Sequence, residues 1–253
     1  MQTEIAVLDK GFVQLVEWMG GDRGVVQSAR VSYNSQGLKT PDEDKKLIAY
    51  LLKNQHGTPF EQAVFKFHVK CPIFAMRQWI RHRMSSYNEL SGRYAESKLE
   101  FYIPESWRIQ DKVNKQGSLD EGLTLGQNRN MNAALSRHCA EAANLYKLML
   151  KDNIAKEMAR FALPLNLYTE FYWTVNARAL MHFIKLRSDS HAQWEMQQYS
   201  NALAKIFSEI MPWTYAAFEE HVLFAESLSA LEVMDGHGQE KVEHVFCQGC
   251  TDS

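Results

Sequence analysis

The chain has 253 residues, 45% hydrophobic and 23% charged, so it is long enough to bury a core and has the composition of an ordinary globular protein. A formal net charge of −2 argues against a protein that grips polymeric DNA or RNA, because such proteins usually present a basic face. The sequence contains no 18-residue apolar run that could span a membrane, and its first residues, which include Glu4, lack the basic start of a secretory signal.

The four cysteines are scattered or terminal, so their spacing indicates no disulfide framework. They are Cys71, Cys139, Cys247 and Cys250. Cys247 and Cys250, with His244 nearby, make only half of a zinc site, and we expect no metal site there. We interpret residues 226–253 as a flexible C-terminal extension. A reducing cytoplasm is the expected compartment.

The first part of the chain predicts strands on either side of two helices. The helix at 42–53 has the clearest start, because Thr40 fits an N-cap and Pro41 fits the first helical position. Strict alternation of apolar and polar residues is typical of half-buried strands. In chain order we expect a strand pair, or a strand and a turn, over 5–18, helices over 25–33 and 42–53, a loop at 57–59 and a strand over 65–70.

A helix is predicted to begin at Pro72 and to run into residues 81–94. On such a helix Gln78, Arg81 and His82 fall at i, i+3 and i+4 and share one face. That face would present an amide, a guanidinium and an imidazole to one ligand. An exposed polar face is the alternative.

The remaining elements are mostly helical, with one further long strand. In order we expect a short strand at 101–103, a polar surface excursion over 108–126, helices over 127–150 and 154–162, a strand over 165–175, and helices over 176–187, 193–210 and 213–224. This order predicts a single α+β domain over residues 1–225, with helices packed on a small sheet.

Residues 81–94 hold three Arg, one His, one Glu, three Ser and one Gly, a composition poorly suited to a core. Arginine is costly to bury unpaired, so the cluster indicates an anionic ligand or paired acids. Ser91-Gly92-Arg93 offers a hydroxyl, a closely approachable backbone and a bidentate fork, which suits a phosphate. A solvated loop with surface ion pairs is the alternative.

Arg81-His82-Arg83, seven further residues and then Ser91 resemble the signature of the flavin-dependent thymidylate synthase family. Four other segments resemble further blocks of that family, in the same order. They are residues 56–61, 163–168, 173–178 and 186–195. In order and spacing the resemblance covers roughly residues 5–222, which makes it far more specific than a short arginine motif alone.

The resemblance implies a largely antiparallel sheet flanked by helices, assembled as a homotetramer whose active sites are shared between subunits. It implies the reductive methylation of dUMP to dTMP. Methylenetetrahydrofolate, a folate, would donate the carbon, and NADPH would supply reducing equivalents through FAD. The chain has no Gly-x-Gly-x-x-Gly after a strand, so this would not be a Rossmann flavin site.

The resemblance also implies which residues bind each molecule. Those for FAD are Thr58, Arg81, His82, Arg83, Glu89, Asn176, Ala177, Arg178 and His182. Those for dUMP are Gln78, Trp79, Ile80, Arg81, Glu89, Leu90, Ser91, Gly92, Arg93, Arg160 and Arg187.

Arg187 is the expected catalytic residue. An arginine cannot readily be the base that removes the uracil N3 proton, but it can stabilise the resulting anion. Asp189 or a helix end could hold its guanidinium in place. A helix C-terminal arginine favoured by the dipole is the alternative. Cys71 is interpreted as a structural cysteine, and Ser91 as a phosphate ligand in preference to a nucleophile.

Plainer roles stay open for several of these residues. Asn176 could cap a helix, and Arg178 with His182 could form a surface pair at i and i+4. Arg160 could pair with Glu157. Two other functions also stay open: a flavin-dependent hydroxymethylation of dUMP, and a non-catalytic nucleotide-binding or RNA-binding protein.

Overall fold

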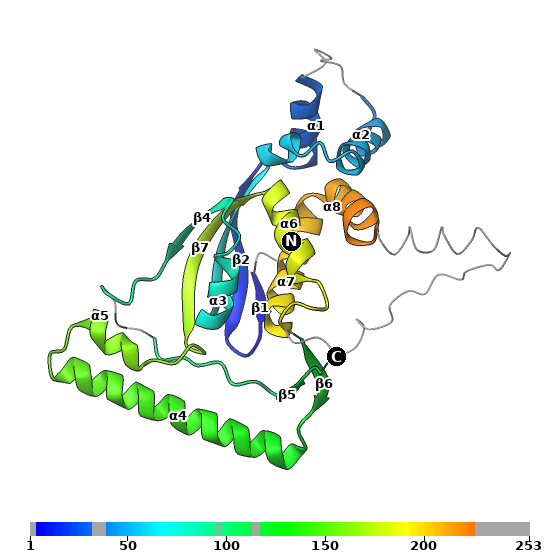
Figure 1. The fold of residues 1–253 in the computed structure, drawn as a ribbon. Coiled ribbons are helices and arrows are strands. Elements are labelled where there is room, and N and C mark those ends of the chain that lie inside the picture. The colour runs from blue at the N-terminus through cyan, green and yellow to red at the C-terminus, as the bar shows by residue number, and fades with distance from the viewer. Residues whose placement is uncertain (1–3, 32–38, 95, 97, 113–116, 226–253) are drawn as a thin grey trace.

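Five strands form one antiparallel sheet at the centre of the molecule (Figure 1). In spatial order they are β1 (Glu4–Val7), β2 (Gly11–Met19), β3 (Val64–Pro72), β7 (Tyr168–Asn176) and β4 (Ser85–Glu89). The computed structural model describes residues 4–31, 39–94, 96, 98–112 and 117–225. The predicted α+β class, with its antiparallel sheet and flanking helices, is confirmed. The proposed extension at 226–253, with Cys247 and Cys250, lies outside the described residues.

Helices and two short strands account for most of the remaining described chain. The helices are α1 (Asp22–Val31), α2 (Pro41–Lys53), α3 (Ile73–Trp79), α4 (Leu125–Lys151), α5 (Lys156–Ala159), α6 (Ala177–Arg187), α7 (Trp194–Ile210) and α8 (Pro212–Phe218). Short 3-10 turns span Thr58–Gln62 and Arg160–Ala162, and a π turn spans Glu219–Leu223. The short strands β5 (Arg108–Gln110) and β6 (Ser118–Gly122) pair with each other. Among the described helices, none is long and apolar enough to cross a membrane.

One face of the sheet is buried under α3, α6 and α7. The alternation on β3 places Phe65, Phe67 and Val69 on this face, each at most 1% exposed. The indole of Trp79, at the end of α3, has no exposed surface. Its ring centroid lies 5.2 Å from that of Trp173 on β7, and contacts with rings on α6 and α7 complete its surroundings. Trp79 therefore joins the sheet to three helices.

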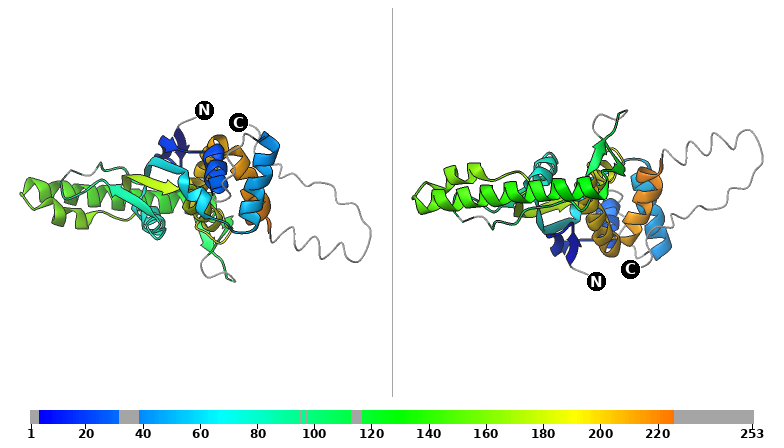
Figure 2. Two further views of the ribbon diagram at one scale, coloured as in Figure 1. Left: turned by 90° about the horizontal axis from the view of Figure 1, so that it is seen from above. Right: turned by 90° about the horizontal axis from the view of Figure 1, so that it is seen from below.

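The long helix α4 lies across one end of the sheet, between α5 and the β5–β6 pair (Figure 1). Viewed from above and below, α4 extends well beyond the sheet to one side (Figure 2). Thr124 and Gln127 form a capping box at its start, so the helix begins two residues before the predicted position. The predicted cap of α2 is confirmed, since Thr40 and Glu43 form the same reciprocal bonds.

The helix that begins after Pro72 is shorter than predicted, and this changes the interpretation of the signature. It ends at Trp79, and the backbone N–H of His82 bonds the Trp79 carbonyl in the turn that follows. Ser85 already pairs with Val175 of β7, so only a few residues are available to reverse the chain. The prediction that Gln78, Arg81 and His82 share a helical face is therefore wrong.

Four smaller predictions also need correction. Residues 58–62 form a 3-10 turn in place of a loop, and residues 101–103 contribute a single bridge between Phe101 and Leu167. The second long strand begins at Tyr168, because the chain between Pro164 and Leu167 forms a turn. The polar excursion contains the β5–β6 pair, whose short strands lack a clear alternation.

A buried carboxylate ties the two ends of the domain together. Asp22, at the start of α1, is 8% exposed. It accepts hydrogen bonds from the backbone N–H of Trp213 at 2.9 Å and from the N–H and hydroxyl of Thr214 at 2.9 and 2.6 Å. These bonds satisfy donors in the first turn of α8, and a negative charge at a helix N-terminus is itself favourable.

We expect Asp22→Ala to lower the free energy of unfolding by about 2–4 kcal/mol, because buried donors lose a charged acceptor. Urea denaturation followed by circular dichroism measures the change. The control is Asp42→Ala, since the Asp42 side chain is 84% exposed and contacts only Lys45 nearby at 3.6 Å. Equal effects of the two substitutions would contradict the role given to Asp22.

Candidate active site

Two distant parts of the chain meet at the end of α6, where Arg187 contacts Gln78 and His82. The Nε of Arg187 donates to Nε2 of His82 at 3.0 Å, and one terminal nitrogen donates to the backbone carbonyl of Gln78 at 3.2 Å. The guanidinium is thus held by the end of α3 and the turn after it. Asp189 does not hold it as suggested, because its carboxylate bonds the backbone and ring of His191 at 2.8 and 2.7 Å.

The imidazole of His82 is held in its neutral form. Its ring packs against Phe183, with centroids 4.6 Å apart, and lies 5.9 Å from the ring of His182. Burial, assisted by the charge of Arg187 and by His182, lowers the pKa of His82 to about 4. Because Nε2 accepts from Arg187, the hydrogen-bond network assigns the ring proton to Nδ1.

The two arginines that flank His82 have the opposite environment. Arg81 and Arg83 are both exposed, while His82 between them is half-buried. The turn after α3 therefore points one imidazole inward and offers two guanidinium groups to the surface. Guanidinium groups that are not buried in ion pairs are suited to binding an anion.

A cavity of about 340 Å³ lies where β4 ends, and it brings together Glu89, Leu90, Ser91, Gly92 and Arg160. Glu89 accepts a hydrogen bond from the hydroxyl of Thr169 at 2.7 Å. Five of the predicted dUMP residues thus share one cavity.

Arg93 and Arg160 are both linked to Glu157, but in different ways. The carboxylate of Glu157 pairs with Arg93 at 3.3 Å, while Arg160 donates from Nε to the Glu157 backbone carbonyl, also at 3.3 Å. The suggested side-chain pair between Arg160 and Glu157 is therefore not the contact that forms. Both ends of the Arg93–Glu157 pair are more than half exposed, so it contributes little to stability.

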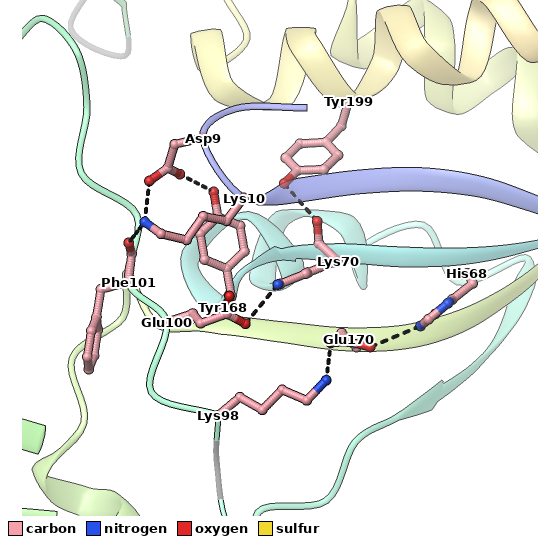
Figure 3. A network of polar contacts seen from close by, with 10 residues as sticks. All are labelled: Asp9, Lys10, His68, Lys70, Lys98, Glu100, Phe101, Tyr168, Glu170 and Tyr199. Atoms are coloured by element: carbon pink, nitrogen blue, oxygen red, sulfur yellow. Dashed lines mark hydrogen bonds and ion pairs between the residues drawn. The ribbon is translucent and has the colours of Figure 1, made fainter. Parts of the chain in front are cut away.

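One wall of this cavity carries Lys70, Lys98, Glu100 and Glu170, whose pairing the sequence does not predict (Figure 3). Lys70 bonds Glu100 at 2.8 Å, and Lys98 bonds Glu170 at 3.3 Å. His68, outside the lining of this cavity, contacts the same Glu170 carboxylate at 3.2 Å. The alternation of β3 places His68 and Lys70 on one face. Their acidic partners come from segments that no local pattern connects to β3.

A second cavity, of about 290 Å³, lies between α2, the turn at 57–62 and α6. Arg178 and His182 line it, so the structure brings two predicted FAD residues together there. The other residues around it are Leu51, Leu52, Gln55, His56, Gly57, Phe60, Met181, Lys185, Phe218 and Val222. Arg178 also pairs with Glu61 at 2.6 Å.

Gly57 leaves room for the side chain of Arg178 to cross this turn. A Cβ atom at residue 57 would lie 2.5 Å from Nε of Arg178 and 2.8 Å from its Cζ. Only glycine leaves room for the guanidinium to lie against the backbone here. The cavity therefore combines cations, imidazoles and an apolar lining.

Three further predicted FAD residues, Thr58, Asn176 and Ala177, lie at or beside the start of α6. The side-chain oxygen of Asn176 accepts from the backbone N–H of Ala179 at 2.9 Å, so its role as a helix cap is confirmed. Ala177 is fully buried and donates its N–H to the carbonyl of Ala63. Thr58 begins the adjacent 3-10 turn.

The predicted substrate residues Trp79 and Ile80 differ in what they can contact. The side chain of Trp79 is fully buried, so its indole is unavailable to a ligand, and any contact would use its backbone. Its carbonyl accepts from the hydroxyl of Tyr87 at 3.1 Å. Ile80 and Leu90 are each almost half exposed.

The described cysteines offer no activated nucleophile. Cys71 has no exposed surface, and burial, together with the charge of Glu89, raises the pKa of its thiol well above the usual range. A thiol that stays protonated cannot attack a pyrimidine ring. Cys139 is also buried and unpaired with another cysteine. The structural interpretation of Cys71 agrees with this environment.

Comparison with known proteins decides the family. Residues 14–213 match the family model described as "Thymidylate synthase complementing protein". The chain belongs to the flavin-dependent thymidylate synthase family. A flavin-dependent thymidylate synthase from Thermus thermophilus is 53% identical over 229 residues, which cover 90% of this chain and 83% of that one. One from Kosmotoga olearia is 53% identical over 218 residues, covering 85% and 93%.

Solved structures with the same fold include a relative with a different name. The UMP/dUMP methylase PolB from Streptomyces cacaoi, bound with 5-Br dUMP, is 33% identical with a TM-score of 0.77, and the match covers 85% of this chain and 97% of that one. The same protein bound with 5-Br UMP gives a TM-score of 0.76 at 33% identity.

As a flavin-dependent thymidylate synthase, the chain is an enzyme that uses FAD. The cavity between α2 and α6 fits that cofactor chemically. Arg178 and Lys185 supply positive charge for a pyrophosphate, while the apolar side chains suit an aromatic ring system. The bare backbone of Gly57 lets Arg178 lie close to the turn.

The depressed pKa of His82 predicts a pH dependence of stability. The folded pKa of about 4 lies below the ordinary value of 6.5, so the unfolded chain binds more protons at this site between those pH values. The contribution of neutral His82 to the free energy of unfolding is complete above pH 6.5 and is lost as the pH falls toward 4. We expect His82→Gln to lose less stability than the wild type between about pH 7 and about pH 5.

Urea midpoints at the two pH values measure this difference. His191→Gln is the control, since the His191 side chain is 71% exposed. If the stability of His82→Gln changed with pH as much as that of the wild type, the neutral, half-buried imidazole would be contradicted.

Proposed function

We propose that this enzyme converts dUMP to dTMP in a reductive methylation. Methylenetetrahydrofolate donates the carbon, and NADPH provides the reducing equivalents. When bound, FAD would supply those reducing equivalents for the reduction of the nucleotide. The observation that carries the proposal is the guanidinium of Arg187, held by His82 and the carbonyl of Gln78 so that part of it remains for a substrate.

The binding residues divide into two groups by chemistry. For dUMP we propose Ser91, Gly92, Arg93 and Arg160 at the phosphate, because a hydroxyl, backbone and two guanidinium groups gather at the end of β4. Glu89 and Leu90 of the same cavity, the side chain of Gln78, and the backbone of Trp79 and Ile80 complete the proposed substrate site.

For FAD we propose the charged lining of the second cavity and the turn after α3. The residues are Thr58, Arg81, His82, Arg83, Glu89, Asn176, Ala177, Arg178 and His182. Arg81 and Glu89 belong to both sets, since flavin and uracil must lie close together for hydride transfer. The buried, unpaired thiols of Cys71 and Cys139 accord with a reducing cytoplasm as the compartment.

Arg187 acts on the pyrimidine ring in this proposal. Loss of the N3 proton makes uracil anionic, and a fixed guanidinium stabilises that anion by charge-assisted hydrogen bonds. Burial lowers the pKa of Arg187, yet an arginine begins above about 12 and stays charged. His82 contributes by staying neutral, because a second cation there would repel the guanidinium.

We expect Arg187→Ala to lower turnover by about 10²- to 10³-fold, as when an oxyanion donor is removed. Arg187→Lys should recover only part of it, because a point charge lacks the planar fork. The assay is anaerobic turnover of dUMP with methylenetetrahydrofolate and NADPH, with the product identified by mass.

Flavin content should stay near normal in both variants. The matched control is Arg137→Ala, on the exposed surface of α4. Wild-type turnover of FAD-loaded Arg187→Ala at saturating dUMP would refute the role of Arg187. A product carrying an added hydroxymethyl group would refute the methylation.

We further propose a homotetramer in which two chains complete each site. Ser91, Gly92 and Arg160 line one cavity, whereas Arg178 and His182 line another that shares no residue with it. Thr169 at the first cavity and Asn176 at the base of α6 are separated along β7 by about 23 Å. Apolar side chains are also exposed on this chain, with Phe161 at 74% and Met158 at 54%, which suits subunit contacts.

Mixing two inactive variants tests the shared site. In co-expressed hybrids of Arg187→Ala and Arg160→Ala, roughly one quarter of the sites would combine an intact Arg187 from one chain with an intact Arg160 from another. Turnover in the hybrids should therefore rise toward about one quarter of the wild-type value and exceed that of either parent. If each chain carried a complete site, mixing would restore nothing, and a fully active monomer by light scattering would also contradict the proposal.

A further inference from the structure

The side-chain amide of Gln78 lies at one end of a chain of hydrogen bonds. Its Nε2 donates to Oε1 of Gln193, the residue that precedes α7. Nε2 of Gln193 in turn donates to Oε2 of Glu195 at 2.9 Å. Residues 115 positions apart are thus connected by side chains alone.

On its other side, Glu195 is held by the segment that contains β5. Its side chain is only 4% exposed, and Oε1 accepts from Arg108 of β5 at 2.7 Å and from the hydroxyl of Tyr102 at 3.2 Å. Arg108 is itself fixed, because its Nε bonds the hydroxyl of Ser118 at 3.0 Å and its guanidinium lies over the ring of Trp194.

The carboxylate of Glu195 fixes which group donates and which accepts at each hydrogen bond of this series. The carboxylate of Glu195, paired with Arg108, accepts hydrogen bonds, so Gln193 turns its NH₂ toward it and its carbonyl oxygen toward Gln78. Gln78 must then turn its own NH₂ toward Gln193. The carbonyl oxygen of Gln78 is left facing away from the network, as an acceptor.

A purely structural role would not need this arrangement. A buried ion pair costs desolvation energy and is weak grounds for stability, and apolar residues could fill the same space. An amide without an oriented neighbour can flip by a half-turn and exchange its donor for its acceptor. The backbone carbonyl of Gln78 also receives Arg187, so one residue connects the network to the proposed catalytic group.

We propose that Glu195 and Gln193 are positioning residues that fix the amide orientation of Gln78, so that its carbonyl oxygen accepts from an N–H or O–H donor of the nucleotide substrate. This inference rests on the proposed function, in which Gln78 binds dUMP. Arg108 and Tyr102 hold Glu195 in place and thereby give the β5–β6 excursion a role in substrate binding.

The test compares KM and kcat for dUMP in the full-length, FAD-loaded enzyme. Gln193→Ala interrupts the series of hydrogen bonds between Gln78 and Glu195. Glu195→Gln keeps the shape of the side chain but replaces the carboxylate by an amide, which no longer fixes which partner donates. We expect each to raise KM for dUMP about tenfold with little change in kcat, as when one oriented hydrogen bond to substrate is lost. Gln198→Ala, on the same helix, should leave both parameters unchanged, because its amide contacts only the helix backbone.

A double variant separates positioning from an independent effect. If Gln193 acts through Gln78, Gln78→Ala combined with Gln193→Ala should raise KM no more than Gln78→Ala alone. FAD content and melting temperature of Gln193→Ala should stay close to those of Gln198→Ala.

Three outcomes would overturn the proposal. A lower melting temperature with unchanged KM in Gln193→Ala and Glu195→Gln would show a structural role only. Multiplying effects in the double variant would show that Gln193 acts separately from Gln78. An unchanged KM in Gln78→Ala would contradict the proposed binding of substrate by Gln78, and therefore also the positioning of Gln78 by Gln193 and Glu195. Formation of dTMP by that variant would still support the proposed reaction.

Discussion

The burial of Trp79 is the packing constraint on which the rest of the site depends. Its indole contacts rings on β7, α6 and α7, so the end of α3 cannot shift without disturbing all three elements. Gln78 and His82 flank this anchor and share its rigidity. A rigid support matters because an arginine that stabilises a developing anion must already be in place when the charge forms.

The polar groups around Trp79 differ in how deeply they are buried. Buried Glu195 is paired with Arg108, half-buried His82 is neutral, and Arg81 and Arg83 lie at the surface. Each group is charged or neutral according to how much water reaches it and which partner it has. The overall charge of −2 hides this pattern, since cations and acids nearly cancel over the whole chain. Local pairing, more than total charge, prepares the molecule for small anionic ligands.

Much of the fold could be predicted from sequence, and the limits of prediction were local. Alternation identified β3, and Thr40 with Pro41 identified the start of α2. The end of α3 was missed because helical spacing continued past Trp79 while the pairing of β4 with β7 required a turn. The β5–β6 pair is not predicted because the sequences of Arg108–Gln110 and Ser118–Gly122 are too short and too polar to show an apolar alternation.

The sequence by itself determined the class of fold, the family signature and the residue types available for binding an anion, because these depend on neighbours along the chain. Only the tertiary structure decided the partners. Arg187 meets His82 across 105 residues, and Gln78 meets Gln193 across 115. Asp189, the nearer candidate, bonds His191 instead. Periodicity specifies which face a residue occupies, but contacts between faces depend on how α3, α6 and α7 pack around Trp79, and no local pattern encodes that packing.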